Sequence, residues 1–367
     1  MRASTIKERL LTAVLIADRV TGKKETLPVL SCILFKIDKD LLICATNLEA
    51  GIEIKVPCDV SEKGVVAVPS GVLSQTMRSI GGDKVNLTTQ DGNLIIESRG
   101  TRTLIKSIPH EEFPMLPGGG EKGSFTIPRE RFIQGLQSVS YAASPSMIRP
   151  ELGSVYVSIK DGVLTCVATD SFRLAEKTIK RGREGESEEI ELLIPLKHAL
   201  EIVHILERSG AEEISLNTDE SQLTVTADGI RYVSRIVDGT FPNYAEIVPK
   251  SFTTEATLLK NDFAEMLKKA RVFSGADQHA GLHVYPKKKV FTATAQSADV
   301  GEMSDAIDAA LSGADIDINF HIGYLADCLS AIGSDSITLS FSGIGKPLVI
   351  RGVSDSLFMY LVMPLNR

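Results

Sequence analysis

The sequence predicts an α+β fold built from three copies of one unit, each running helix, strands, helix, strands. Three stretches share alternating apolar residues, a polar turn and a second alternating strand, and they cover residues 30–53, 151–176 and 279–303. Three others each contain a strand end, a helix and then a hairpin, and these helices fall within residues 68–82, 194–210 and 320–333. Both features recur about every 120 residues, which indicates an internal repeat.

An amphipathic helix precedes each strand pair and completes the unit. These helices cover residues 6–20, 129–143 and 261–272. In the first, helical spacing predicts that the apolar face turns to the core through Ile6, Leu10, Ala13, Val14 and Ala17. The same stretch resembles a secretion signal, but its interspersed charges favour a helix of the folded domain. No apolar run approaches the ~20 residues of a membrane span, so we expect a soluble protein without membrane contact.

Glycines mark the ends of the units. Each second helix closes on Gly81, Gly210 or Gly333, where we expect a left-handed C-cap, and Asp91-Gly92 predicts a tight hairpin. We place the domain boundaries at residues 1–120, 125–248 and 249–367. Each domain holds two similar half-units whose sheet edges can pair with the next, and such arrays curve. A ring of two chains would then use a different surface of each chain at every contact.

Composition narrows the function classes. The 367 residues carry a formal net charge of −7, which excludes a protein that grips nucleic acid through an all-over positive surface. The 5 cysteines lie far apart without a C-x-x-C motif, which favours reduced thiols and a cytoplasmic protein. His198, Glu201 and His204 share a helix but lack the spacing of a zinc motif. We find no catalytic motif and expect no metal and no cofactor.

The stretch VATDSFRLAEK, residues 167–177, ends a strand in a polar cluster. Thr169 and Asp170 match Thr46 and Asn47 of the first copy, so hydrogen bonding to the following turn explains them. The next four residues, 171–174, have no evident counterpart in the other copies, which makes them a candidate site.

Five stretches in order resemble the bacterial DNA polymerase III beta subunits, the beta sliding clamps. They are ETLPVLSCILF, IRPELGSVYVSI, VATDSFRLAEK, RIVDGTFPNYAEIVP and YLVMPLNR. The resemblance covers essentially the whole chain and implies the DNA clamp fold, with helices lining the hole of a head-to-tail homodimeric ring and antiparallel sheets outside. Such a ring encircles double-stranded DNA without sequence specificity, tethers the replicative polymerase and has no catalytic site of its own.

The resemblance also implies a hydrophobic peptide groove between the second and third domains. Its partners would be the polymerase alpha subunit, the clamp loader, repair polymerases and other proteins carrying a short Leu- and Phe-containing motif. Two or three such anchors, at roughly 1.5–3 kcal/mol each less the ordering cost, suggest affinity near the micromolar range. The groove residues are Leu152, Thr169, Ser171, Phe172, Arg173, Leu174, Pro242, Ile247, Tyr324, Pro347, Leu361, Val362, Met363, Pro364 and Leu365.

Two further surfaces follow from the resemblance. DNA contacts are expected at Lys24, Arg149, Lys7, Arg78, Arg129, Lys197 and Lys260. The dimer contact is expected where the end of the first domain meets a helix of the third domain of a second copy, through Leu104, Ile105, Ile108, Lys269, Val272 and Phe273.

Two other functions fit parts of the sequence. An enzyme using Asp170, Ser171 and Arg173 would lose turnover on Asp170→Asn, although no partner base or metal-ligand set accompanies these residues. A peptide-binding ring that never holds DNA would be indifferent to charge reversal at Lys24 and the helices. Comparing retention on circular and linear DNA separates a sliding clamp from both.

Overall fold

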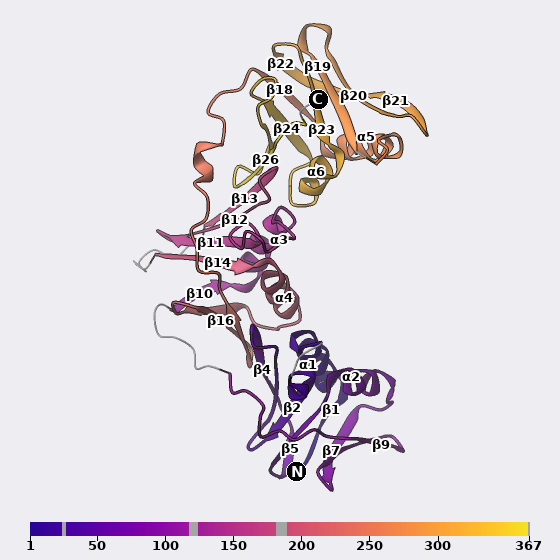
Figure 1. The fold of residues 1–367 in the computed structure, drawn as a ribbon, viewed down its shortest axis with the longest axis vertical. Coiled ribbons are helices and arrows are strands. Elements are labelled where there is room, and N and C mark those ends of the chain that lie inside the picture. The colour runs from indigo at the N-terminus through magenta and orange to yellow at the C-terminus, as the bar shows by residue number, and fades with distance from the viewer. Residues whose placement is uncertain (24–26, 117–123, 181–188, 277, 366–367) are drawn as a thin grey trace. The chain divides into compact units, whose positions relative to one another are not determined.

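The computed structural model describes residues 1–23, 27–116, 124–180, 189–276 and 278–365. Its contacts divide the chain into two compact units (Figure 1). The first unit holds Met1–Ile133 and Leu200–Ile236, and the second holds Gln134–Ala199 and Val237–Arg367. Each unit therefore contains one terminal repeat together with half of the middle repeat.

The first unit contains two antiparallel sheets. One is ordered β5-β1-β7-β8-β9, with β1 (Arg2–Ile6), β5 (Asp59–Glu62), β7 (Lys84–Gln90), β8 (Asn93–Ser98) and β9 (Thr101–Ile105). The other is ordered β10-β15-β16-β17-β4-β3-β2-β6, with β2 (Cys32–Ile37), β3 (Leu41–Thr46), β4 (Ala50–Val56), β6 (Gly64–Pro69), β10 (Ser124–Pro128), β15 (Glu213–Thr218), β16 (Gln222–Ala227) and β17 (Ile230–Arg235). Helix α1 (Lys7–Val20) packs against α2 (Ser70–Ser79) and against β3 and β4.

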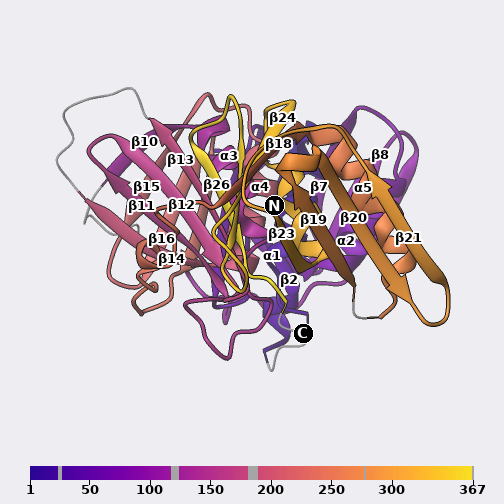
Figure 2. The same cartoon turned by 90° about the horizontal axis from the view of Figure 1, so that it is seen from above.

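The second unit repeats this plan. Its larger sheet is ordered β14-β11-β12-β13-β26-β25-β24-β18-β22, with β11 (Ser154–Lys160), β12 (Val163–Thr169), β13 (Arg173–Lys180), β14 (Ile190–Pro195), β18 (Thr254–Leu259), β22 (Ala309–Gly313), β24 (Ser336–Phe341), β25 (Leu348–Gly352) and β26 (Phe358–Val362). Its smaller sheet, ordered β21-β20-β19-β23, has β19 (His279–Tyr285), β20 (Val290–Ser297), β21 (Gly301–Ala306) and β23 (Ile316–His321). Helix α5 (Lys260–Phe273) packs on α6 (Ile322–Asp327), on β20 and on β21, which is the outer strand of its sheet (Figure 2).

The middle repeat supplies helices α3 (Arg129–Ser140) and α4 (Leu196–Glu207). The predicted pair of helices per repeat is therefore present in the described part of the chain. The apolar residues that helical spacing turned inward are buried, with Phe132 and Phe263 both at 0% exposure. Ile6 is the exception at 44%, because the chain is still in strand β1 there and α1 begins one residue later.

Two strand pairs join neighbouring repeats. In the first unit β17 of the middle repeat pairs antiparallel with β4 of the first, and in the second unit β13 of the middle repeat pairs with β26 of the third. We call β4, β17 and the turn 46–50 the first joint, and β13, β26 and the turn 169–173 the second joint. Each joint makes one continuous sheet from two repeats, as unpaired sheet edges favour.

The predicted left-handed helix caps at Gly81, Gly210 and Gly333 are wrong, since none of the three has a positive φ. Side-chain cations satisfy helix-end carbonyls instead. Arg129 Nη1 donates to the carbonyls of Leu206, in the last turn of α4, and of Ser209, just after it, at 3.0 and 2.9 Å. Lys260 Nζ donates to the carbonyl of Ile332 at 2.7 Å.

The hairpin predicted at Asp91-Gly92 is confirmed. Both residues have positive φ, 50° and 79°, and Gln90 pairs with Asn93 across the turn. Within the described residues no helix is both long and apolar enough to cross a membrane.

Candidate functional site

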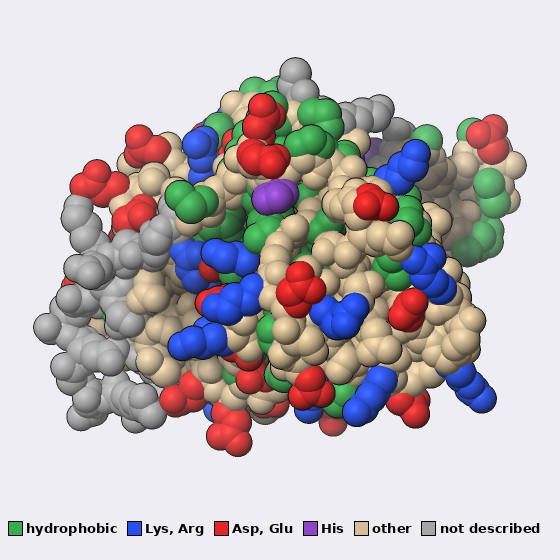
Figure 3. Space-filling view, turned by 90° about the horizontal axis from the view of Figure 1, so that it is seen from below, with side chains coloured by type: hydrophobic (Ala, Val, Ile, Leu, Met, Phe, Trp, Pro, Cys, Tyr) green, Lys and Arg blue, Asp and Glu red, His purple; other side chains and the backbone are tan. Residues whose placement is uncertain are grey.

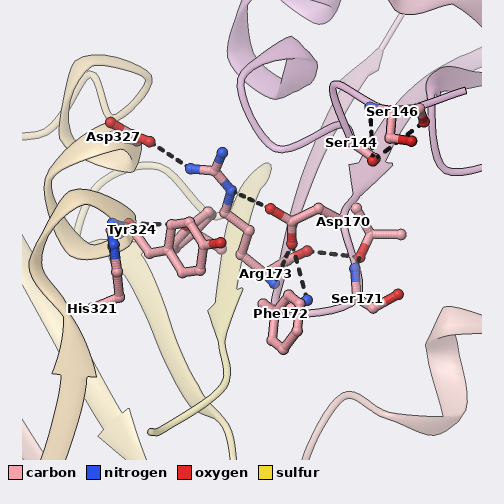
Figure 4. Close-up of polar contacts among 11 residues, drawn as sticks. Ser144, Ser146, Asp170, Ser171, Phe172, Arg173, His321, Tyr324 and Asp327 are labelled. Carbon is pink, nitrogen blue, oxygen red and sulfur yellow. Dashed lines mark hydrogen bonds and ion pairs between the residues drawn. The ribbon is translucent and has the colours of Figure 1, made fainter. Parts of the chain in front are cut away.

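The polar cluster at the end of β12 forms a closed turn. Thr169 Oγ1 donates to the carbonyl of Arg173 at 2.6 Å and accepts from the backbone N–H of Ser171 at 3.1 Å. Asp170 Oδ1 accepts from the N–H groups of Phe172 and Arg173, at 2.9 and 3.0 Å (Figure 4). Side-chain oxygens thus replace the strand ladder where the chain reverses. Asp170 is occupied by this turn and by Arg173, so it is not a free base.

Arg173 links the turn to helix α6. Its Nε donates to Asp170 Oδ2 at 3.0 Å, and its Nη1 donates to Asp327. The guanidinium carbon lies 4.4 Å from the ring centre of Tyr324 (Figure 4). It lies 5.9 Å from the ring centre of Tyr141. Burial alone would lower the pKa of Arg173, but Tyr360 and the two carboxylates hold that pKa above its ordinary value. The Arg173 side chain, only 11% exposed, therefore joins the turn 169–173 to helix α6 through two ion pairs, and we call these pairs the charged tie of the second joint.

Apolar side chains form the floor beside this tie. Leu174 and Leu361 are directly paired across β13 and β26 and belong to one buried cluster, which also contains Phe241. Met363 and Val248 pack against that cluster and are only partly buried. A deformable methionine beside a fixed apolar floor suits the docking of apolar peptide side chains.

Two large apolar residues near the floor are open to solvent. Phe172 is 61% exposed and Ile247 is 52% exposed. The backbone of Phe172 is nevertheless fixed on both sides, because its carbonyl accepts from the N–H of Met363 at 2.8 Å. We call Phe172 and Met363 the groove rim.

The second unit contains all fifteen predicted groove residues. Beyond those already described, Leu152 and Val362 are buried, while Pro242, Pro347, Pro364 and Leu365 are partly exposed. Leu365 donates its N–H to the carbonyl of Asn319 at 2.9 Å, which fixes the chain end alongside β23.

The expectation that residues 171–174 have no counterpart is wrong for the backbone. Thr46 Oγ1 donates to the carbonyl of Ala50 at 2.8 Å, and Asn47 Oδ1 accepts from the N–H groups of Glu49 and Ala50. Leu48 has φ 72°, and the matching Ser171 has φ 77°. The first joint therefore carries the same turn, and only its side chains differ.

Beside the first joint a guanidinium also bonds a helix, but it belongs to Arg19 of helix α1 and not to a residue of the turn. Arg19 corresponds to Tyr141 of the middle repeat, because the two residues lie equally far along the chain from the first residues of α1 and α3, Lys7 and Arg129. Arg19 forms a bidentate ion pair with Glu201 at 2.9 and 3.0 Å. Glu201 occupies the position in α4 that Asp327 occupies in α6. The predicted groove set omits Tyr141 and Asp327, which contact Arg173, although this comparison of the repeats could have indicated them.

His321 begins helix α6 beside the tie. Its Nδ1 accepts from the N–H of Tyr324 at 3.3 Å, and the two rings are centred 4.4 Å apart. Burial, with Arg173 next in importance, lowers the pKa of His321 below its ordinary value. The neutral imidazole is thus the form whose Nδ1 accepts the hydrogen bond from Tyr324 at the start of α6.

The predicted DNA-contact residues divide into two groups. Arg78 and Lys197 are exposed on their helices, and Lys7 is partly exposed. Arg129 and Lys260 instead donate to the carbonyls already described, and Arg149 pairs with Glu151 at 2.9 Å. Lys24 lies outside the described residues. One face of the molecule shows Lys and Arg interspersed with Asp and Glu (Figure 3).

The predicted dimer residues also divide. Leu104 and Val272 are 46% and 63% exposed, whereas Ile105 is 3% exposed. Ile108 packs with the buried cluster around Ala67, and Phe273 is partly buried. Lys269 Nζ donates to Asp305 at 2.8 Å.

Three family models of the DNA polymerase III beta subunit match the chain in order. The N-terminal domain matches residues 1–117, the central domain residues 126–243 and the C-terminal domain residues 245–366. The chain belongs to the DNA polymerase III beta subunit family. Like its relatives it is a DNA sliding clamp for the replicative polymerase, with no catalytic role, which removes the enzyme hypothesis.

Individual beta subunits are similar over their full length. The beta sliding clamp of Streptomyces coelicolor is 26% identical over 376 residues, covering 100% of this chain and 99% of that protein. The solved beta subunit of Thermotoga maritima gives a TM-score of 0.94 at 25% identity, covering 100% and 99% of the two chains. The solved sliding clamp of Bacillus subtilis gives 0.94 at 23% identity, with the same coverage.

Proposed function

We propose that two copies of the chain close head to tail into a ring, with β9 of one copy pairing with β21 of the other. The two internal joints carry this proposal. β17 and β26 each follow the last hairpin of a repeat and pair with β4 and β13, and β9 holds the corresponding place in the first repeat. β21 corresponds to β4 and β13, and both β9 and β21 are edge strands. The same pairing between copies joins these remaining edges.

The repeats also suggest a register for this pairing. The turns Arg99-Gly100 and Asp228-Gly229 both have positive φ, so Arg102 corresponds to Arg231. Gln296 stands near the end of β20, just as Asn47 follows β3, and Ala293 and Cys44 stand equally far before them. Asp305 pairs with Ala293 and Glu53 pairs with Cys44, so Asp305 corresponds to Glu53.

Arg231 and Glu53 are directly opposite in the first joint and form an ion pair at 2.9 Å. The matching pair between the two copies is Arg102 of β9 with Asp305 of β21. Because the strands would be antiparallel, Leu104 would then lie opposite Met303. Opposite charges and apolar residues facing across strands stabilise a pairing.

Cysteine cross-linking tests this register. Leu104→Cys combined with Met303→Cys should give covalently joined chains on mild oxidation, because directly opposite strand residues meet disulfide geometry. Of the native cysteines only Cys58 is not buried, so background linking is small. Leu104→Cys alone is the control, and a double variant that stays uncross-linked contradicts the pairing.

The second joint is proposed as the peptide groove for the polymerase alpha subunit, the clamp loader, repair polymerases and other motif-bearing proteins. The buried cluster with Phe172 and Ile247 exposed beside it supports this assignment. Titration with a fluorescent Leu- and Phe-containing peptide should give one site per chain near micromolar affinity. A peptide that fails to bind, or that binds equally after Leu361→Asp, contradicts the groove.

DNA in the ring is held by topology and by weak phosphate contacts, for which the exposed Arg78 and Lys197 and the partly exposed Lys7 are candidates without a bond described above. The clamp should stay on nicked circular DNA and leave when that DNA is linearised. Arg78→Glu with Lys197→Glu should shorten retention, whereas Lys180→Glu, an exposed residue at the end of β13, should not. Equal loss from circular and linear DNA contradicts encirclement. We place this activity in the cytoplasm.

A further inference from the structure

The first joint has the backbone of the peptide groove but a different rim. The N–H of Arg235 donates to the carbonyl of Glu49 at 2.9 Å, just as the N–H of Met363 donates to Phe172 at 2.8 Å. Glu49 and Arg235 therefore stand where the groove rim stands. Their side chains form an ion pair at 3.7 Å and are 61% and 62% exposed.

The surroundings of this pair are apolar. Gly51 takes the place of Leu174, and a Cβ added there would lie 2.1 Å from Leu116 Cδ2, so the Leu116 side chain fills the space that Leu174 fills in the groove. Leu48, in the same turn, is 51% exposed. Next to the rim the floor is thus apolar at both joints, because Val233 lies opposite Gly51 as Leu361 lies opposite Leu174. Two places further along, the first joint carries the Arg231–Glu53 ion pair where the second joint has Met359 opposite Glu176, so the first joint is more charged at its rim and beyond it.

We propose that the Glu49–Arg235 pair is a specificity determinant that keeps Leu- and Phe-containing peptides off the first joint. An apolar anchor arriving there must strip water from two charged groups, which opposes the gain from its own burial. At the groove rim the same anchor meets Phe172 and Met363, where burial is favourable. This inference rests on the proposed peptide groove.

The test is peptide stoichiometry in the full-length chain. Glu49→Phe with Arg235→Met should raise the number of bound fluorescent Leu- and Phe-containing peptides from one to two per chain. A photoreactive version of the peptide should then label the turn 46–50 in addition to the turn 169–173. Both substituted side chains are largely exposed, and circular dichroism melting checks that the variant folds as the wild type does.

The matched control exchanges the charges. Glu49→Arg with Arg235→Glu keeps an ionic rim and should still bind one peptide. A single site in the Phe/Met variant, or a second site in the exchanged variant, overturns the proposal. If the wild type binds no peptide, the proposed peptide groove at the second joint is contradicted. The role of the Glu49–Arg235 pair is then still tested separately, by whether the photoreactive peptide labels the turn 46–50 in the Phe/Met variant.

Discussion

The two joints differ in where the charged tie begins. At the first joint Arg19 reaches Glu201 from helix α1, and the turn carries alanine at position 50. At the second joint Arg173 reaches Asp327 from the turn itself, and Tyr141 takes the place of Arg19. Because Arg173 lies in the turn itself, its bond to Asp327 holds the turn directly against helix α6. One repeated backbone thus differs between its two copies by a few side chains at the sheet junction, and these carry the proposed binding site.

The largest expected effect comes from giving the second joint the rim of the first. Phe172→Glu with Met363→Arg removes two apolar contacts and adds charges that a peptide must desolvate. A cost of about 3 kcal/mol or more is expected, which weakens peptide binding more than about 100-fold. Fluorescence titration measures this, and Val353→Glu, another exposed apolar site, should leave the affinity unchanged.

The two arginine ties should differ in their contribution to stability. Arg173→Met leaves Asp170, only 10% exposed, without its cation, so the free energy of unfolding should fall by about 3 kcal/mol. Arg19→Met likewise leaves Glu201, 12% exposed, without its cation, but Arg19 itself is 45% exposed and solvent screens this pair more, so the loss should be smaller, about 1 kcal/mol. Urea unfolding of the two variants decides this, and equal losses would contradict the contrast between the joints.

Both turns hold a non-glycine residue at positive φ, at Leu48 and Ser171. Glycine relieves that strain, but it also loses more entropy on folding, so Ser171→Gly and Leu48→Gly should each stabilise the chain by at most about 1 kcal/mol. Thermal unfolding checks both variants. A clear loss of stability in either would show that its side chain has a role beyond the turn.

The smallest expected effect is a pH dependence of folding stability, and it is confined to the second joint. The pKa of His321 is lower in the folded chain than its ordinary value of 6.5, so its stabilising contribution is complete above that pH. As the pH falls below 6.5 the unfolded chain takes up the proton first, and stability is lost until the folded pKa is reached. Arg173, Asp327, His279 and Arg271 face the ring and enter the balance.

Amide exchange at Tyr324 between pH 7.5 and 5 measures this after correction for intrinsic exchange. His321→Gln should remove the pH dependence. The first joint, probed at the turn 46–50, serves as the internal control.

Repeat period, helices and hairpin turns could be predicted because each depends on spacing and local turn chemistry. The core positions Leu136 and Met266 followed from helical spacing alone. The tie from Arg173 to Asp327 could not be predicted this way, because it joins residues from different repeats. The glycine caps at Gly210 and Gly333 failed for a related reason, since the distant cations Arg129 and Lys260 bond the carbonyls that a local cap would have satisfied.

Arg129 and Lys260 carry a consequence for movement along DNA. Arg129 Nη1 and Lys260 Nζ already donate to main-chain carbonyls, so each side chain is anchored at a helix end and can turn toward a phosphate less freely than an unanchored cation. Each cation withheld in this way lowers the number of counterions displaced on binding. We therefore expect one-dimensional diffusion along DNA to depend more on the exposed Arg78 and Lys197 than on these two anchored cations.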